Sequence, residues 1–191
     1  MATNLETPCM ADPLPTFRYH PDPLATGSVV ASNATCRCCG QARGLMYAGP
    51  VYANEDLDDE LCPWCIADGS AAARFGAEFV DSAGVGGYGD WDRVPPAVVV
   101  EVSQRTPSFS GWQQERWWTH CGDAAAFLGP SGAAELRSMW AAALPALQAD
   151  VGYTGSDWEE YVESLDRERG PTAYVFRCHH CGQLGGYSDC H

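Results

Sequence analysis

The amino-acid sequence predicts an α+β fold, in which cysteine-bearing turns and short strands at both ends of the chain pack with a helical middle region. Three Cys-x-x-Cys pairs stand towards the two ends, and a glycine that eases a tight turn follows two of them. Between them, the alanine- and leucine-rich stretch 131–147 is typical of a helix. The alternating residues 172–177 lead into the third pair and are typical of a strand. A strand, a cysteine turn and a returning strand form the unit of a zinc ribbon, so both ends are expected to be zinc-ribbon-like.

The first half of the chain is expected to consist of short strands around the first two cysteine pairs. Residues 1–14 form a polar, proline-punctuated stretch that we interpret as a flexible leader. Two hydrophobic runs, 29–36 and 45–52, are predicted to be strands. A short helix is expected to begin near Ser70 and to run through 75–79.

The second half is predicted to be largely helical until its last two strands. The valine run within 97–105 fits a helix that begins at a proline, but fits a strand equally well. The helix over 131–147 is expected to break near Pro145. A second helix over 156–167 carries acids in its first turn, where the helix dipole favours them. A final strand over 184–188 is expected to pair with the strand that enters the third cysteine pair.

The first two cysteine pairs have the spacing of a structural metal site. The motifs Cys36-x-x-Cys39 and Cys62-x-x-Cys65 supply four thiolates, which is the number of ligands that a tetrahedral Zn²⁺ takes. A redox pair at Cys62 and Cys65 is the alternative, but no βαβ pattern surrounds this motif. We therefore predict a structural zinc site at these four cysteines and a free thiol at Cys38.

The third pair, Cys178 and Cys181, needs two further ligands from elsewhere in the chain. We favour His120 and Cys121, because the glycine that follows them lets the backbone bend sharply between adjacent ligands. The rival ligands are Cys190 and His191. A second zinc site is accordingly predicted at the third pair.

Charge and composition exclude several classes of function. The chain has 25 acidic and 11 basic residues, and its formal net charge is −14. Duplex nucleic acids and anionic membranes are bound through basic surfaces, so neither is an expected partner. No apolar stretch is long enough to span a bilayer, and the N-terminus lacks the pattern of a secretory signal. We therefore expect a cytoplasmic protein whose ten cysteines are kept reduced.

The negative charge is concentrated in the segment 54–60 and in the predicted helix 156–167. Such clusters are often solvated faces, but they also suit a basic protein partner. Tryptophans that are exposed would anchor such a contact, since tryptophan dominates interface hot spots. The candidate partner-binding residues are Glu55, Asp56, Asp58, Asp59, Glu60, Trp112, Trp158, Glu159 and Glu160.

Several longer blocks of sequence are similar to one known family. The blocks are Tyr-His-Pro-Asp-Pro at 19–23, Leu-Cys-Pro-Trp-Cys-Ile-Ala-Asp-Gly-Ser at 61–70, Arg-Thr-Pro at 105–107 and Thr-His-Cys-Gly-Asp-Ala at 119–124. Through them the sequence resembles the CbrC family of bacterial proteins, from about residue 15 to the end. The resemblance implies an association with tolerance to colicins and related toxins, and a place among candidate immunity proteins.

The expected organisation is then a leader over 1–14 and a single CbrC-like domain over 15–191. Within that domain we expect an N-terminal zinc-binding half at 29–80 and a C-terminal zinc-ribbon-like half at 109–191.

The leading hypothesis for function is a non-enzymatic, zinc-stabilised acidic protein that binds and neutralises a basic, nuclease-type bacterial toxin. A nuclease carries a basic surface for its substrate, and an acidic inhibitor can mimic that substrate. One alternative is a metal-dependent hydrolase at the second zinc site, with Glu115 or Asp123 as general base. The other is a nucleic-acid-binding zinc ribbon, for which the local support is Arg37, Arg43 and Arg177.

Overall fold

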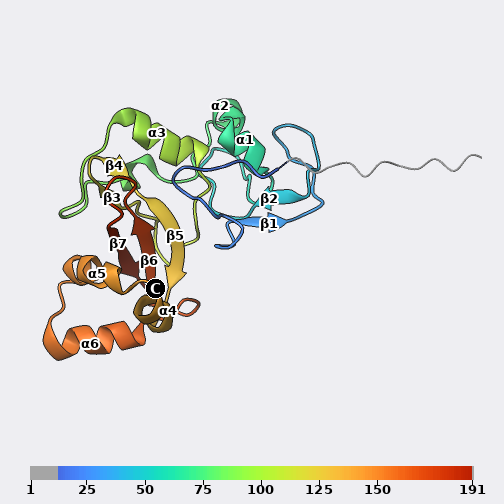
Figure 1. Ribbon diagram of the computed structural model, residues 1–191. Helices are drawn as coiled ribbons and strands as arrows, with labels where there is room; N and C mark the ends of the chain where they lie inside the picture. The colour runs from blue at the N-terminus through green and yellow to red at the C-terminus, as the bar shows by residue number, and fades with distance from the viewer. Residues whose placement is uncertain (1–12, 191) are drawn as a thin grey trace, which may run out of the picture.

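A three-stranded antiparallel sheet organises the C-terminal half of the protein (Figure 1). Its strands are β5 (Ala126–Ser131), β6 (Thr172–Arg177) and β7 (Leu184–Asp189), in that spatial order. The computed structural model describes residues 13–190, so the predicted leader lies almost entirely outside the described residues. The mixture of helices and sheet confirms the predicted α+β class.

The strands on either side of the third cysteine pair form where the sequence predicts them. Strands β6 and β7 pair without interruption along their whole length, from Thr172 opposite Asp189 to Arg177 opposite Leu184. Strand β5 was not predicted. It contains Gly129 and Pro130, and its register shifts next to Gly129, so its sequence lacks a regular alternating pattern.

The helix predicted over 131–147 forms only in part, and the break expected near Pro145 is present. The structure has helix α4 (Ala133–Ser138), a 3₁₀ turn (Ala141–Ala143) and helix α5 (Leu144–Val151). Ser131 belongs to β5 instead of capping a helix, and Pro145 lies in the first turn of α5. Proline lacks the amide hydrogen that a helix interior needs but is tolerated in a first turn, so a new helix begins there.

Helices cover one face of the sheet, and aromatic side chains fill the other. Helices α4, α5 and α6 (Gly155–Ser164) lie together beside the sheet (Figure 1) and bury a core that includes Leu136, Leu147 and Val162. Ring-to-ring packing among Phe109, Trp117, Phe127, Tyr174, Phe176 and Tyr187 builds the core on the opposite face.

The same aromatic core receives helix α3 (Pro96–Arg105), whose Val102 is fully buried. The ambiguous valine run is therefore helical, because a helix presents Val98, Val99 and Val102 to the sheet on one side.

The elements of the N-terminal half are very short. They are β1 (Val29–Ala31), β2 (Leu45–Tyr47), α1 (Pro63–Ala67), α2 (Ser70–Phe75) and a 3₁₀ turn (Ser82–Gly84). Helix α2 ends earlier than the predicted 75–79, because Gly76 adopts a positive φ of 62° and terminates it. None of the helices within residues 13–190 combines the length and the apolar character needed to cross a bilayer.

Specific hydrogen bonds join the N-terminal half to the segment 103–115, which precedes the sheet in the chain. The amide of Ser108 donates to the Tyr47 hydroxyl at 3.2 Å, and the Tyr52 hydroxyl donates to Glu115 Oε2 at 2.7 Å. The amide of Phe79 donates to the carbonyl of Ser103 at 2.6 Å. These bonds are buried or partly buried, so they set how the two halves meet.

Candidate metal centres

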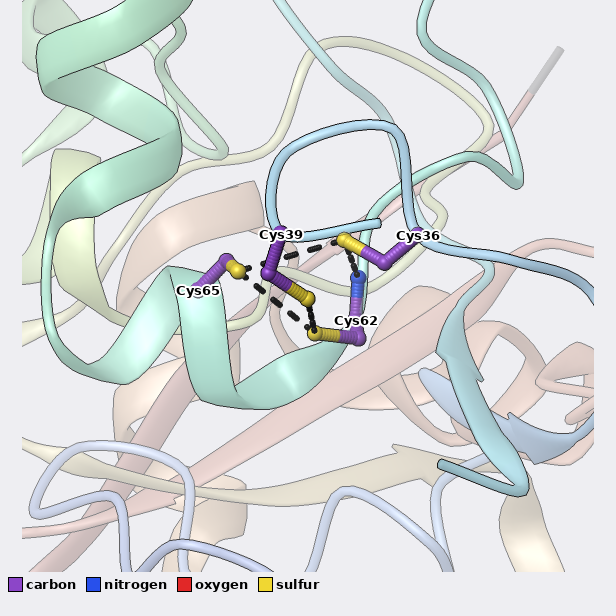
Figure 2. A group of neighbouring side chains, drawn as sticks. All are labelled: Cys36, Cys39, Cys62 and Cys65. Carbon is purple, nitrogen blue, oxygen red and sulfur yellow. Dashed lines mark hydrogen bonds between the residues drawn. The ribbon is translucent and has the colours of Figure 1, made fainter. Parts of the chain in front are cut away.

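The sulfur atoms of Cys36, Cys39, Cys62 and Cys65 converge on one point (Figure 2), and all four lie within 4.8 Å of one another. The Sγ atoms of Cys36 and Cys65 are 3.9 Å apart, those of Cys39 and Cys62 3.8 Å, and those of Cys62 and Cys65 3.6 Å. A tetrahedral ion with bonds of about 2.3 Å to sulfur holds its ligands about 3.8 Å apart. The first cysteine group can therefore surround such an ion without rearrangement.

The two Cys-x-x-Cys-Gly turns position their sulfur atoms through the same pair of backbone hydrogen bonds. In the first turn Gly40 donates to the carbonyl of Cys36 at 2.7 Å, and Cys36 donates to the carbonyl of Gln41 at 2.9 Å. In the third pair Gly182 donates to the carbonyl of Cys178 at 3.1 Å, and Cys178 donates to that of Gln183 at 2.8 Å. Both glycines have a positive φ, so a glycine is needed at this position of the turn.

The remaining pair of the first group is presented by helix α1. Cys62 precedes its first residue and Cys65 lies within it, with Pro63 opening the helix. The amide of Cys62 also donates to Cys36 Sγ at 3.3 Å (Figure 2). Such amide–sulfur bonds favour the thiolate form.

Hydrogen bonds and burial shift the pKa values of three of these thiols in opposite directions. A hydrogen bond from the Cys62 thiol is the main factor that lowers the pKa of Cys36 to about 4, and it raises the pKa of Cys62. Burial raises the pKa of Cys65 to about 12. Four sulfurs in contact can all be thiolates only around a cation, so the arrangement is the one that a metal ion stabilises.

A second group brings together the four ligands that the sequence favoured. Ligand atoms of His120, Cys121, Cys178 and Cys181 lie within 4.8 Å of one another. His120 Nδ1 is 3.2 Å from Cys121 Sγ and 3.4 Å from Cys181 Sγ. Nitrogen and sulfur ligands of a tetrahedral zinc lie about 3.6 Å apart, so this group also has suitable spacing.

A tight hairpin makes it possible for two adjacent residues to face one point. Strands β3 (Thr119–His120) and β4 (Asp123–Ala124) are joined by the two residues Cys121 and Gly122, with φ of 56° and 69°. Two successive positive φ angles are the pattern of a type I′ turn. The sharp bend expected from Gly122 is present, and it swings Cys121 back towards His120.

The rival ligands at the C-terminal end do not reach this group. Cys190 follows β7 at the end opposite the cysteine turn, because Asp189 pairs with Thr172 while Leu184 pairs with Arg177. Six residues of strand span about 20 Å. His191 lies outside the described residues.

Asp123 anchors the hairpin beside the second group. Its Oδ2 accepts from Arg18 at 2.6 Å and lies 3.1 Å from His180 Nε2, while Oδ1 accepts from the Tyr19 hydroxyl at 2.9 Å. Burial would raise the pKa of Asp123, but the hydrogen bonds from Tyr19 and His180 outweigh it and lower the pKa. Both carboxylate oxygens are occupied, so Asp123 is poorly placed to act as a general base.

The two groups differ in their exposure to solvent. Cys36, Cys62 and Cys65 are buried in the core of the N-terminal half. In the second group only Cys178 is buried, and Cys121 and Cys181 are exposed. The first group is thus a core component, whereas the second lies at the surface. None of the nine cysteines among the described residues forms a disulfide, and Cys38 is outside the first group, with its Sγ 3.6 Å from Ser70 Oγ.

The structure divides the acidic segment 55–60 into paired and unpaired members. Arg37 binds Glu55 at 2.6 Å and Glu60 at 2.8 Å. Within residues 13–190, Asp58 and Asp59 form no ion pair and are exposed. Asp56 is exposed as well, and its carboxylate accepts from the amide of Asp58. On α6, Glu159 and Glu160 are exposed.

The expected tryptophan anchors require correction. Trp158 is only 9% exposed and belongs to the core beneath α6, so it is not available to a partner. Trp112 is half-buried, and its Nε1 donates to Thr172 Oγ1 at 2.8 Å. An amphipathic helix directs its large apolar residue inward, and the acids beside Trp158 concealed that pattern.

Fold and geometry together define an acidic α+β protein with two candidate metal centres. The family described as "Uncharacterised protein family (UPF0167)" matches residues 14–190. UPF0167 proteins of Mycobacterium bovis and Mycobacterium tuberculosis are each 52% identical over 181 residues, covering 92% of this chain and 93% of the relative. One from Pseudomonas aeruginosa is 46% identical over 175 residues, with 91% and 96% covered. No solved structure matches the chain. The chain belongs to the UPF0167 family.

Proposed function

We propose that both groups hold Zn²⁺ and that the protein is a non-enzymatic, acidic binding protein of the cytoplasm whose partner is a basic protein. The finer form of the proposal follows the CbrC resemblance. In that form the partner is a nuclease-type bacterial toxin, and the protein is an immunity or tolerance factor.

The ligand chemistry supports zinc in both groups. Soft thiolates with or without one imidazole are the ligand set of structural zinc, and four protein ligands leave no open position. When loaded, the four-cysteine site keeps a formal charge of about −2 and the three-cysteine site about −1. Metal binding therefore leaves the protein acidic.

The observation that carries the partner proposal is that several of the basic residues form ion pairs within the protein, which leaves an excess of acidic residues. The chain has 11 basic residues against 25 acids. Several arginines are already used within the protein, since Arg18 pairs with Asp123, Arg37 with Glu55 and Glu60, Arg116 with Asp150, and Arg137 with Glu163. Within residues 13–190, the remaining surface charge is dominated by carboxylates that form no ion pair.

Such an acidic surface is complementary to a partner protein whose own basic surface binds the phosphates of a nucleic acid. Electrostatic complementarity raises association rates to as much as about 10⁸–10⁹ M⁻¹s⁻¹ at low salt. The acidic protein would also compete directly with the nucleic acid for the basic surface of the toxin.

The test is co-expression and co-purification with a basic nuclease encoded beside the gene. We expect a stable complex whose association rate falls steeply with salt, and loss of protection of the host cell when the acids at 55–60 are reversed to lysine. Binding that ignores both salt and this charge reversal would refute electrostatic recognition.

A hydrolase at the second group is the alternative with some structural support. A cavity of about 500 Å³ reaches His120, and the ring of Trp118 that stacks on that histidine also lines it. The four protein ligands close the coordination sphere, however, and a catalytic zinc keeps a position for water. An open position seen by X-ray absorption on the zinc-loaded protein would favour the enzyme.

A nucleic-acid-binding ribbon has less support. Arg37 is engaged by two glutamates, and Arg43 contacts Gln41 and the ring of Trp64. We expect no retention on heparin at physiological salt, and firm retention would reverse this ranking.

A further inference from the structure

The two cysteine groups differ in how easily an oxidant dissolved in the solvent reaches them. In the first group three of the four cysteines are at most 3% exposed, and the fourth, Cys39, is half-buried. In the second group Cys121 and Cys181 are exposed. Oxidation of a thiolate depends on its access to solvent, so the second group is the one that a small oxidant reaches.

A buried thiol accompanies the exposed Cys181 in the same turn. Cys178 is 2% exposed, and its sulfur belongs to the set of ligand atoms that lie within 4.8 Å of one another. The turn is held by the bond from Gly182 to the carbonyl of Cys178 and by the bond from Cys178 to that of Gln183. The amide of His180 also donates to Cys178 Sγ at 3.4 Å and keeps this sulfur in the turn. An exposed thiol beside a second thiol is the arrangement of a redox pair, because the exposed sulfur is oxidised and its neighbour closes the disulfide.

Cys121 is exposed as well, but it lies in the hairpin of β3 and β4 and outside this turn. A disulfide between Cys121 and Cys181 would join two separate hairpins and would require their backbones to approach each other. Closing the four-residue turn 178–181 involves one short loop only, which is the smaller rearrangement. The turn therefore supplies the partner of Cys181.

The hairpin that carries the other two ligands is fixed by contacts that need no metal. Asp123 accepts from Arg18 at 2.6 Å and from the Tyr19 hydroxyl at 2.9 Å. Next to it in the chain, the amide of Gly122 donates to Asp92 Oδ2 at 2.8 Å. Loss of metal from the second group would therefore leave the surrounding fold in place, whereas the first group is part of a core.

We propose that Cys181 and Cys178 are a modification site at which hydrogen peroxide forms a reversible disulfide, so that the second group gives up its metal while the first keeps it. The Cys181 thiolate attacks one oxygen of the peroxide, an S–O bond forms, the O–O bond breaks and hydroxide leaves. The Cys178 thiolate then attacks the resulting sulfenic sulfur, an S–S bond forms and a second hydroxide leaves. The two sulfurs lose two electrons in total, and one peroxide molecule is reduced.

The disulfide removes two of the four ligands of the second group. His120 and Cys121 remain, and two ligands hold a zinc ion more weakly than four. A thiol reductant reverses the disulfide by exchange, after which all four ligand atoms can bind again. The inference rests on the zinc part of the proposed function and adds to it a state that depends on oxidant, in a compartment that otherwise keeps thiols reduced.

The test uses the full chain with its zinc bound, and hydrogen peroxide as the oxidant. We expect about one zinc per chain to be released, and the other at least about tenfold more slowly, because exposure governs thiolate oxidation. A chromogenic chelator follows the release. Dithiothreitol followed by added zinc should restore the original zinc content.

Tryptic peptides identify the disulfide. The chain has no lysine, so trypsin cleaves it after arginine only, and Cys178, Cys181 and Cys190 fall in one peptide, 178–191. Cys121 falls in another, 117–137. Cys190→Ser is the matched control, because Cys190 is exposed and follows the end of β7 that lies away from the cysteine turn. This variant should release zinc at the unchanged rate, and peroxide should leave its peptide 178–191 two hydrogens lighter and without a free thiol.

The outcomes separate this inference from the function on which it rests. A cross-link between the peptides 117–137 and 178–191 would overturn the assignment of the pair. Equal rates of release from both groups, release that dithiothreitol and zinc do not reverse, or retention of two zinc ions under peroxide would overturn the inference and leave zinc binding by both groups intact. A protein that never holds a second zinc would refute the zinc proposal as well.

Discussion

Replacing Cys65 with serine should abolish folding of the N-terminal half. Cys65 is 3% exposed, and its sulfur lies 3.9 Å from that of Cys36 and 3.6 Å from that of Cys62. The variant removes one of four ligands at the centre of the core that contains Tyr47 and Phe79. Serine is a poor ligand for a soft metal ion, so the remaining three sulfurs would hold it weakly.

The magnitude follows from the size of the elements that this group joins. Strands β1 and β2 have three residues each, and α1 has five. Elements of this length are unstable alone. Zinc binding by such a site is worth about 10–16 kcal/mol, and a whole domain is stable by only about 5–15 kcal/mol. Loss of the site therefore exceeds what the surrounding contacts can supply.

The assay combines solubility, bound zinc per chain and the indole NMR signal of Trp64, which is half-buried on α1 and is one of seven tryptophans in the chain. We expect Cys65→Ser to be insoluble, or to be soluble with Trp64 exposed and one zinc fewer. Cys121→Ser is the matched control, because Cys121 is exposed on a hairpin beside a sheet with its own aromatic core. It should lose about one zinc and stay folded.

A soluble Cys65→Ser protein with a native Trp64 indole signal and a cooperative unfolding transition would refute the structural role of the first group. Equal damage from Cys121→Ser would contradict the difference between a buried and a surface site.

Three further predictions concern stability. His20 is buried, and burial lowers its pKa to about 4, so the unfolded chain takes up a proton near pH 6.5 before the folded one does. The free energy of unfolding should therefore fall as pH drops from 7 towards 4, by about 2 kcal/mol at pH 5. Measured by urea unfolding, it should fall less steeply with pH in His20→Gln than in the unmodified protein, and equal slopes would contradict this. In Gly186→Ala the new Cβ would clash with the carbonyl oxygen of Tyr174 on the paired strand, so the free energy of unfolding should fall by about 3 kcal/mol and the Tm should fall with it; an unchanged Tm would exclude the clash. Arg137→Ala removes an exposed ion pair with Glu163 and should leave the midpoint of urea unfolding unchanged, whereas a clear shift of that midpoint would show that the pair is more than a surface contact.

Both candidate metal-ligand groups were predictable because their signals are local. A Cys-x-x-Cys-Gly turn places its two sulfurs together through bonds within six residues, and the same bonds form at Cys36 and at Cys178. The first two Cys-x-x-Cys pairs could be assigned to one site because a tetrahedral ion takes four ligands. The choice of His120 and Cys121 depended on Gly122, whose positive φ is a backbone requirement visible in the sequence.

Elements with weak local signals were missed. Strand β5 is stabilised by its pairing with β6, which compensates for the poor strand propensity of Gly129 and Pro130. The alanine-rich stretch before Pro145 favours a helix at almost every position, so the sequence did not reveal that Ser131 lies in a strand. These assignments depend on contacts between residues some forty positions apart.

The sequence by itself determined the acidic character, the two sets of sulfur ligands and the strands around the third cysteine pair, because composition and short-range backbone geometry suffice for each. Only the tertiary structure decided which charges remain free. Arg37 neutralises Glu55 and Glu60 but leaves Asp58 and Asp59, and the fold brings these two beside Glu115. Charge pairing across a folded surface depends on distances between distant segments, and no local pattern encodes those distances.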